Sequence, residues 1–400
     1  MRQISPPGSH HDEQEIEALV ELLRSSRLMI GENVAAFEEQ VAPLMAKRHG
    51  VMVNSGTSAI YLALDLLDLQ PGDEIITSVL TFSADIAPMV RAGVVPAFVD
   101  VDETGYQIDV SRIEEMVGPR TRAIMTPNLI GNCPDWDVIR EIADRQDLLV
   151  IEDTCDVLGD TLLRGTRTGE RADIGVTSFA VTHSITAAGG GGMVGLDDPD
   201  LVDRCLVKRR WGRRSERYLF GSKRGQSDRF SATVDGLSYD NIFVFEEAKV
   251  WNFEPTELAA AFGLVQLRKL GEFNRRRREA FSRYDEWFQE HEDRFVRPTT
   301  TPDLETTWML YPFMVRPGVG LTRTETQELL EKHGIPTRVV WSGNITRQPG
   351  FSEIERREPE DGFPNADRIM EHALMLPTHQ GLVDEDIDYV LETLEKQLLV

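Results

Sequence analysis

The sequence predicts an α/β protein in which a large domain with a mostly parallel sheet precedes a smaller α/β domain. Short apolar runs alternate with amphipathic segments in the first part of the chain, a pattern typical of strands joined by helices. A long charged helix follows the 252–270 region, and a second set of apolar runs comes after it. The 400 residues are 41% hydrophobic, which is ample for a large core.

Each expected strand of the large domain is an apolar run bounded by polar or turn residues. These runs lie at 50–54, 73–78, 94–101, 122–128, 148–153 and 175–180. The expected helices lie at 58–67, 135–145 and 271–292. The smaller domain contains apolar runs at 308–317 and 335–340 and a final helix from Asp384. We place the domain boundary between residues 255 and 256, so that 1–255 form the large domain and 256–400 the linking helix and small domain.

Composition excludes several classes of partner. The formal net charge of −24 argues against nucleic acid, because phosphate backbones require a basic surface. The N-terminus has no basic start followed by an apolar core, and no apolar run reaches membrane-spanning length, so we expect a cytoplasmic protein without a membrane partner. The three cysteines, Cys133, Cys155 and Cys205, are too few and too scattered for a disulfide framework.

Two strand-end loops carry polar residues that suggest a cofactor site. Gly56, Thr57 and Ser58 close one strand and open a helix, where backbone amides and hydroxyls form a phosphate cup, although such residues are equally common as plain N-caps. Asp153 ends an apolar strand. A carboxylate there would keep a pyridinium nitrogen protonated or, alternatively, cap the next turn.

Two further loops add an aromatic ring, a hydroxyl and an imidazole. Phe82 follows the 73–78 strand and would stack on a pyridine ring or, alternatively, lie in the core. Ser178 would contact phosphate, and His183 follows it in the same loop. Taken alone, His183 is more typical of a structural histidine, because most histidines outside a recognised site are structural. The glycine run 189–192 predicts only a turn or a close backbone approach.

The most informative feature of the sequence is the absence of a lysine where a pyridoxal-phosphate enzyme would carry one. No lysine occurs between Lys47 and Lys208, although this stretch otherwise reads like the catalytic half of a pyridoxal-phosphate enzyme. His183 stands where such an enzyme carries the lysine that binds its cofactor covalently. Imidazole exchanges protons near neutral pH but forms no stable imine. The chemistry should therefore shift from amine transfer towards proton shuttling on a non-covalently held cofactor.

The order of these motifs resembles the DegT/DnrJ/StrS family of sugar aminotransferases over nearly the whole chain. The motifs are NSGTSA, TF, VPAFVDVD, GN, IED, SFxxxH, GGGG and WNFEPTELAAAFGLVQLRKL. With GNITRQP at 343–349, the histidine resembles the 3-dehydratase branch, whose members act on GDP-4-keto-6-deoxymannose and related sugars. This resemblance implies fold type I of the pyridoxal-phosphate enzymes, the aspartate aminotransferase-like fold. It also implies removal of the C3 hydroxyl of a nucleotide-linked 4-keto-6-deoxyhexose with pyridoxamine phosphate.

The resemblance also implies a role for each motif residue. Gly56, Thr57 and Ser178 match the phosphate contacts, Phe82 the stacking aromatic, and Asp153 the partner of the pyridine nitrogen. His183 matches the catalytic base. Asn252 matches an asparagine that reaches the cofactor phosphate of the neighbouring subunit, which implies a homodimer with shared active sites. An amino donor, expected to be glutamate, would restore pyridoxamine phosphate from pyridoxal phosphate.

The expected substrate carries a diphosphate, so basic side chains are candidates for binding it. Residues 204–224 form a basic island, most of which we expect to be a solvated helix face or a subunit contact, with Arg213 as a candidate ligand. Arg338, Asn344 and Arg347 are alternatives in the segment TRVVWSGNITRQP. His379 in LPTHQG is expected near the site.

Departures from the family pattern leave other readings open. Val181 and Thr182 precede His183 where the dehydratases tend to carry Pro-Ala, and Phe82 often corresponds to a tryptophan. Three cysteines cannot supply the usual four ligands, so we expect no iron–sulfur cluster and no metal. The alternatives are an aminotransferase-like protein without the lysine and a non-catalytic family member. Joint retention of the phosphate cup, Asp153 and His183 favours an enzyme.

Overall fold

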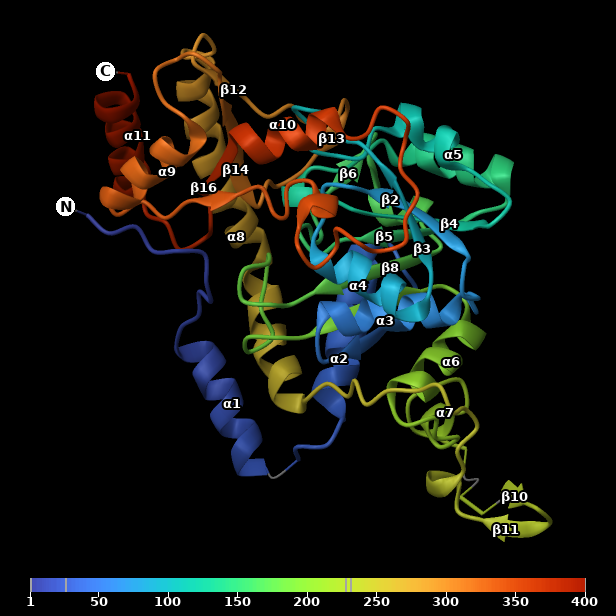
Figure 1. The fold of residues 1–400 in the computed structure, drawn as a ribbon. Helices are drawn as coiled ribbons and strands as arrows, with labels where there is room; N and C mark the ends of the chain where they lie inside the picture. The colour runs from blue at the N-terminus through green and yellow to red at the C-terminus, as the bar shows by residue number, and fades with distance from the viewer. Residues whose placement is uncertain (1, 26, 227–228, 231, 400) are drawn as a thin grey trace.

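The computed structural model describes residues 2–25, 27–226, 229–230 and 232–399 (Figure 1). Its centre is a seven-stranded sheet in the order β1-β9-β8-β5-β4-β2-β3. The strands are β1 (His49–Val53), β2 (Glu74–Ser78), β3 (Val95–Val99), β4 (Thr121–Pro127), β5 (Leu149–Asp153), β8 (Ile174–Ser178) and β9 (Gly192–Leu196). Only β9 runs antiparallel to its neighbours in this sheet, which confirms the predicted α/β class with a mostly parallel sheet.

Strand β9 is the element of this sheet that the sequence does not predict. The sequence predicts only a turn at 189–192, but Gly192 begins a buried strand between β1 and β8. A Cβ atom on Gly192 would lie 2.4 Å from the carbonyl oxygen of Ser55, the N-cap residue of the helix Gly56–Leu66. At this position β9 therefore lies too close to the start of that helix for any side chain. Glycine is depleted in strands, and this steric requirement therefore conceals the strand.

Helices cover the sheet (Figure 1), and all of those named next except the first follow a strand of the sheet in the chain. They are α2 (Glu32–Val41), α3 (Gly56–Leu66), α4 (Ser83–Ala92), α5 (Trp136–Gln146) and α6 (Pro199–Arg209). Ser55 caps α3 by accepting a hydrogen bond from the amide of Ser58 at 3.1 Å, and Asp135 caps α5 in the same way. The helices predicted at 58–67 and 135–145 are confirmed.

Helix α8 (Glu257–Gln289) connects the two parts of the chain and runs along one side of the molecule (Figure 1). It begins at Glu257 rather than at the predicted residue 271, because Thr256 provides an N-cap and the apolar segment after it packs on the core. The predicted domain boundary at 255/256 coincides with this N-cap and stays a prediction.

The C-terminal part is built on an antiparallel sheet in the order β12-β14-β16-β15. Its strands are β12 (Phe295–Val296), β14 (Leu310–Val315), β15 (Arg338–Val339) and β16 (Ala373–Pro377), and its helices are α9 (Arg323–Lys332), α10 (Pro364–His372) and α11 (Asp384–Leu398). Ile4 is buried in the core of this part, and its amide donates to the carbonyl of Gly334. The first residues of the chain therefore pack against the last part of the fold.

The remaining elements lie at the periphery. They are α1 (Glu13–Ser25), α7 (Glu216–Leu219), a small sheet of β6 (Leu162–Leu163), β7 (Thr166–Arg167) and β13 (Leu304–Glu305), and a hairpin of β10 (Ala232–Val234) and β11 (Leu237–Tyr239). The hairpin projects away from the body of the molecule (Figure 1). None of the helices in the described part of the chain combines the length and apolar character needed to cross a membrane.

Candidate functional site

A cavity of about 320 Å³ lies at the carboxyl ends of the central strands, where ligands bind in open α/β sheets. Six of the residues that the sequence predicts for the cofactor line it together, although they come from four separate loops. They are Gly56, Thr57, Phe82, Asp153, Ser178 and His183. The cavity wall also includes Asp85, Cys155, Asp156, Thr182 and Trp341, which the sequence analysis does not assign to the site.

The N-terminus of α3 forms the predicted anion-binding end of this cavity. A Cβ atom on Gly56 would lie 2.6 Å from Cβ of Ser178, so glycine is required for the two loops to approach. This approach places the Ser178 hydroxyl beside the first turn of α3, whose free amides attract anions. Ser58 does not line the cavity: its hydroxyl donates to Oδ1 of Asn54 at 2.6 Å.

Phe82 is the N-cap residue of α4 and is 58% exposed, an unusual state for a large aromatic side chain. The alternative placement in the core is therefore wrong. An aromatic ring open to a cavity is available to stack on a planar ligand.

Asp153, at the end of β5, is one of three carboxylic acids that line the cavity. Its Oδ1 accepts a hydrogen bond from the amide of Cys155 at 2.8 Å. Asp153 therefore also caps the following turn, which is the alternative role that the sequence suggests for it. Burial raises the pKa of Asp153 above its usual range. Asp85 and Asp156 complete the trio, and nothing in their sequence context besides their closeness to Phe82 and Asp153 marks them.

His183 lies in the loop between β8 and β9, beside Asp156, and its Nδ1 makes no hydrogen bond with the residues that the structure describes. Its Nδ1 is 3.4 Å from Oδ1 of Asp156, and the amide of Ile130 donates to Oδ2 of the same carboxylate at 2.8 Å. Ile130 adopts a left-handed backbone with φ of 61°, which is uncommon for a β-branched residue. That strained turn aims an amide at Asp156.

Arg277 of α8 holds the same loop from behind. Its guanidinium donates to the carbonyl of His183 at 3.2 Å and to Oε1 of Gln380 at 2.7 Å. Burial lowers the pKa of Arg277 to about 10, and the nearby charge of Asp156 opposes that shift. Arg277 therefore remains cationic near neutral pH and fixes the position of His183 through the backbone.

Neither lysine that borders the lysine-free stretch lines this cavity. Nζ of Lys47 is buried and donates to the carbonyls of Gly169 and Ala172, at 2.8 and 2.5 Å. Nζ of Lys208 pairs with Glu247 at 2.6 Å. Among the residues that line the cavity, no side chain can therefore form an imine with an aldehyde.

Two predicted residues lie outside the cavity of their own chain. Asn252 is exposed and forms an isolated bridge with Arg210, and Arg213 places its guanidinium 4.2 Å from the ring centre of Trp211. The expected solvated face is wrong for Lys208, Arg209 and Arg210, which are buried. Basic residues of this island pair with acids within the chain: Arg204 with Asp68, Lys208 with Glu247, Arg209 with Glu38, Arg210 with Glu216 and Glu254, and Arg217 with Glu246.

Of the two predicted arginines in the C-terminal part of the chain, Arg338 lies at a cavity. It lines a hollow of about 100 Å³ that shares Thr182 and Trp341 with the main cavity. Its Nη1 donates to the carbonyl of Thr337, and it forms no ion pair with the described residues. Arg347, in contrast, makes a bidentate ion pair with Asp367.

Asn344 and His379 are buried and serve the fold in this structure. The side chain of Asn344 donates to Asp367 at 2.8 Å and caps the turn at Thr346. Nε2 of His379 donates to the carbonyl of Ser5 at 2.8 Å. Burial lowers the pKa of His379 to about 4, so the ring is neutral near pH 7, and its hydrogen bond to Ser5 ties the N-terminal segment to the C-terminal part of the chain.

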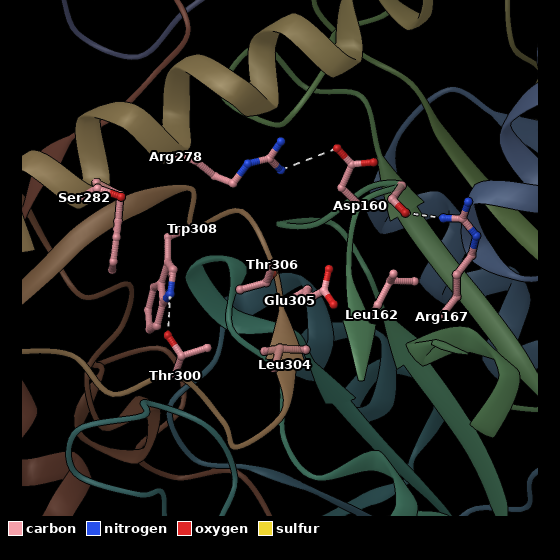
Figure 2. Close-up of a pocket in the computed structure, with 12 residues that line it drawn as sticks. Asp160, Leu162, Arg167, Arg278, Ser282, Thr300, Leu304, Glu305, Thr306 and Trp308 are labelled. Carbon is pink, nitrogen blue, oxygen red and sulfur yellow. Dashed lines mark hydrogen bonds and ion pairs between the residues drawn. The ribbon is translucent and has the colours of Figure 1, made fainter. Parts of the chain in front are cut away.

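A larger cavity of about 610 Å³ lies between α8 and the strands β6 and β13 (Figure 2). Its polar side chains are largely committed to one another: Arg278 approaches Asp160 at 3.5 Å, and Trp308 donates to Thr300. No histidine, cysteine or lysine lines it. The cavity of about 320 Å³, which is lined by a histidine and three carboxylic acids, is therefore the candidate functional site. Among the described residues, no group of three or more His, Cys, Asp or Glu side chains is arranged to hold a metal ion.

Comparisons with known proteins agree on one family. The family model for the DegT/DnrJ/EryC1/StrS aminotransferases matches residues 9–395. The chain is 34% identical to dTDP-4-dehydro-2,6-dideoxy-D-glucose 3-dehydratase of Saccharopolyspora spinosa, over 98% of this chain and 86% of that protein. It is 30% identical to GDP-perosamine synthase of Caulobacter vibrioides, over 92% of this chain and 91% of that protein.

A solved structure extends the similarity to the fold. GDP-4-keto-6-deoxy-D-mannose 3-dehydratase of E. coli, with bound hydrated pyridoxal phosphate, matches with a TM-score of 0.86 and 26% identity. The match covers 98% of this chain and 100% of that chain.

Proposed function

The chain belongs to the DegT/DnrJ/EryC1/StrS aminotransferase family, and we propose that within it this protein is a 3-dehydratase of a nucleotide-linked 4-keto-6-deoxyhexose. The observation that carries the proposal is the composition of the main cavity. It combines five of the predicted cofactor-binding residues (Gly56, Thr57, Phe82, Asp153 and Ser178) with His183, and none of the residues that line it carries an amine. The sugar dehydratase from Saccharopolyspora spinosa, at 34% identity, supports the same reading.

The cavity fits pyridoxal or pyridoxamine phosphate in three respects. The first turn of α3, with Thr57 and Ser178, suits a phosphate, and the close packing at Gly56 leaves that turn accessible. Phe82 presents an aromatic ring to the cavity. Asp153 presents a buried carboxylate, which suits a protonated ring nitrogen.

When bound, the cofactor would supply a pyridine ring that accepts electron density during loss of the C3 hydroxyl. The protein contributes charge and proton transfer. Asp153 keeps a proton on the ring nitrogen. His183 removes a proton from the C4′ carbon, and its imidazolium form donates a proton to the departing C3 oxygen. Asp156, with Oδ1 3.4 Å from Nδ1 of His183, would pair with the imidazolium form of that ring.

Two other parts of the proposal concern partners. We assign regeneration of the amine form to an amino donor, with glutamate expected. We also assign Asn252 to the cofactor phosphate of a neighbouring subunit, the role that the family resemblance implies, and its exposed position outside the cavity of its own chain is compatible with that role. The active enzyme would then be a homodimer with shared sites.

The second candidate is a sugar aminotransferase, and the similarity to GDP-perosamine synthase supports it. The two functions differ in product: a dehydratase yields a 3-deoxy-4-keto sugar, whereas an aminotransferase yields a 4-amino sugar with its C3 hydroxyl intact. Incubating the enzyme with a nucleotide-linked 4-keto-6-deoxyhexose, pyridoxal phosphate and glutamate, then analysing the sugar by mass spectrometry, distinguishes them. A 4-amino sugar with C3 hydroxylated would overturn the dehydratase proposal. Absence of any product with every such sugar would favour a non-catalytic member.

We expect the wild-type protein to hold its cofactor without a covalent bond. Because no amine lines the cavity, borohydride reduction of the loaded protein should leave the mass of the polypeptide unchanged. Intact-mass measurement after denaturation checks this. A stable mass gain on any lysine would contradict the expectation. A family member that carries the lysine, treated in parallel, shows that the reduction works.

Substituting Arg338 by alanine should weaken substrate binding more than it slows turnover. Arg338 lines the hollow that adjoins the main cavity and has no acidic partner in the described part of the chain. It is therefore available to the substrate diphosphate. We expect KM for the nucleotide sugar to rise by about tenfold, the size of one lost charge-assisted hydrogen bond, with little change in kcat.

The matched control is Arg347→Ala, because Arg347 is already engaged by Asp367. It should lower thermal stability and leave KM close to the wild-type value. Equal KM values for the two variants would exclude Arg338 as the diphosphate ligand.

A further inference from the structure

Asp85 is a buried acid in the cavity wall to which the proposed reaction gives no role. It is the third residue of α4 and is 1% exposed. Its Oδ2 accepts a hydrogen bond from the hydroxyl of Thr81. Its Oδ1 is enclosed and, as an acceptor, finds no donor among the residues that the structure describes. An ionised carboxylate half-satisfied in this way is costly to bury.

A proton on Asp85 removes this cost, because Asp153 is then its partner. The two carboxyl groups line the same cavity, where Oδ1 of Asp85 is buried without a donor among the described residues, and they interact as a hydrogen-bonded pair when one of them carries a proton. Two ionised carboxylates at that distance repel, whereas one proton between them makes a hydrogen bond. Burial, and after it the charge of Asp153, raises the pKa of Asp85 well above the usual range, so the proton belongs on Asp85.

We propose that Asp85 is protonated in the native protein and donates a hydrogen bond to Asp153, so that the two acids share one proton and one negative charge. Asp153 thereby stays anionic and is held in place where the ring nitrogen of the cofactor is expected. Asp85 is a positioning residue in this scheme, because it acts through Asp153. The part that concerns the ring nitrogen rests on the proposed function, and the shared proton does not.

The side chains around Asp85 add negative charge on one side and little positive charge on the others, while its place in the first turn of α4 favours the ionised form. The turn after β5 contributes the carboxyl of Asp156 and the thiol of Cys155 in addition to Asp153, and α3 contributes only uncharged residues. The loop after β8 contributes His183, whose Nδ1 faces Asp156. No lysine or arginine lines the cavity to offset the negative charge.

The shared proton predicts a pH dependence of stability. A carboxyl whose pKa is raised by folding binds a proton more tightly in the folded state, so the stability it confers is lost as the pH rises from the unfolded value of about 4 through the raised value. Urea unfolding of the cofactor-free full chain between pH 5 and pH 8 should show this loss. Asp85→Asn should remove it, because an amide keeps the donor and cannot ionise.

We expect the wild-type ratio of folded to unfolded protein to fall by at least about tenfold, relative to Asp85→Asn, over this range. Asp144→Asn, at an exposed position on α5, controls for the loss of one formal charge and should follow the wild type. Identical pH profiles for the wild type and Asp85→Asn would overturn the proposal. If Asp85→Asn fails to fold, Asp153→Asn takes its place: removing the neighbouring charge should reduce the slope, and an unchanged slope would overturn the proposal.

A second measurement tests the effect on Asp153 itself. Titration with pyridoxal phosphate, followed by absorbance, should give Asp85→Asn nearly the wild-type affinity and Asp85→Ala an affinity about tenfold lower, because alanine leaves Asp153 without its donor. Equal affinities for the two variants would refute the donor role. If the wild type binds no pyridoxal phosphate, the cofactor assignment fails, and the unfolding experiment still decides whether the acids share a proton.

Discussion

Replacing His183 by asparagine should abolish cleavage of the C3–oxygen bond while leaving cofactor binding intact. In the proposed reaction this imidazole handles a proton both at the cofactor carbon and at the departing oxygen, and asparagine exchanges neither. General acid–base groups contribute about 100- to 10,000-fold, so we expect kcat to fall by roughly 1,000-fold or more. The measurement is the formation of 3-deoxy sugar from the nucleotide-linked substrate. The dissociation constant of pyridoxal phosphate, obtained separately, should change little.

Asp156→Ala is the matched variant for this prediction. It leaves the imidazole in place but removes the carboxylate 3.4 Å from its Nδ1, so kcat should fall less than in His183→Asn. His183→Lys tests the geometry in the opposite direction: borohydride should now attach a phosphopyridoxyl group to the chain. Wild-type dehydration by His183→Asn would exclude His183 as the base. Failure of the lysine variant to be labelled would show that this position does not face the cofactor carbonyl.

The sequence predicts the fold and the cofactor cavity well because both depend on local patterns that repeat along the chain. Apolar runs that end in polar residues predict strand ends, and the ends of parallel strands meet at one edge of the sheet. Asp153 and Ser178 therefore come together as expected. Strand β9 escapes prediction because close packing requires glycine at two of its five positions, Gly192 and Gly195, and because it continues a glycine run that is typical of a turn.

Residues that act through long-range contacts are the ones the sequence does not reveal. Asp85 and Asp156 acquire meaning only where the start of α4 meets the end of β5. Arg277 lies 94 positions from His183 and reaches its carbonyl only through the path of α8. Arg338 and Arg347 are equivalent candidates in the sequence, and the ion pair of Arg347 with Asp367 is what distinguishes them in the structure. The alternatives for the diphosphate ligand therefore narrow only when the tertiary structure is known.

Asp153→Asn should keep the fold and lose most of the dehydration rate. The carboxylate keeps the ring nitrogen protonated, and a neutral pyridine is a poor electron sink. Loss of a preorganised charge at a buried site costs roughly 100- to 1,000-fold in turnover, and we expect a decrease in kcat of that order. Steady-state measurement of 3-deoxy sugar gives the rate, and the far-ultraviolet circular dichroism spectrum controls for folding.

Asp85 influences the turnover that we expect for Asp153→Asn. In Asp153→Asn, Asp85 remains as a carboxyl in the cavity wall, and loss of the neighbouring negative charge makes it easier to ionise. An ionised Asp85 then supplies part of the missing charge. The double variant Asp85→Asn/Asp153→Asn should therefore turn over more slowly than Asp153→Asn alone. The single variant Asp85→Asn still has the anionic Asp153. Near-normal turnover in the double variant would mean that Asp153 only caps the turn at Cys155. Equal rates for the single and double variants at position 153 would mean that Asp85 never carries the charge and acts solely as a donor to Asp153.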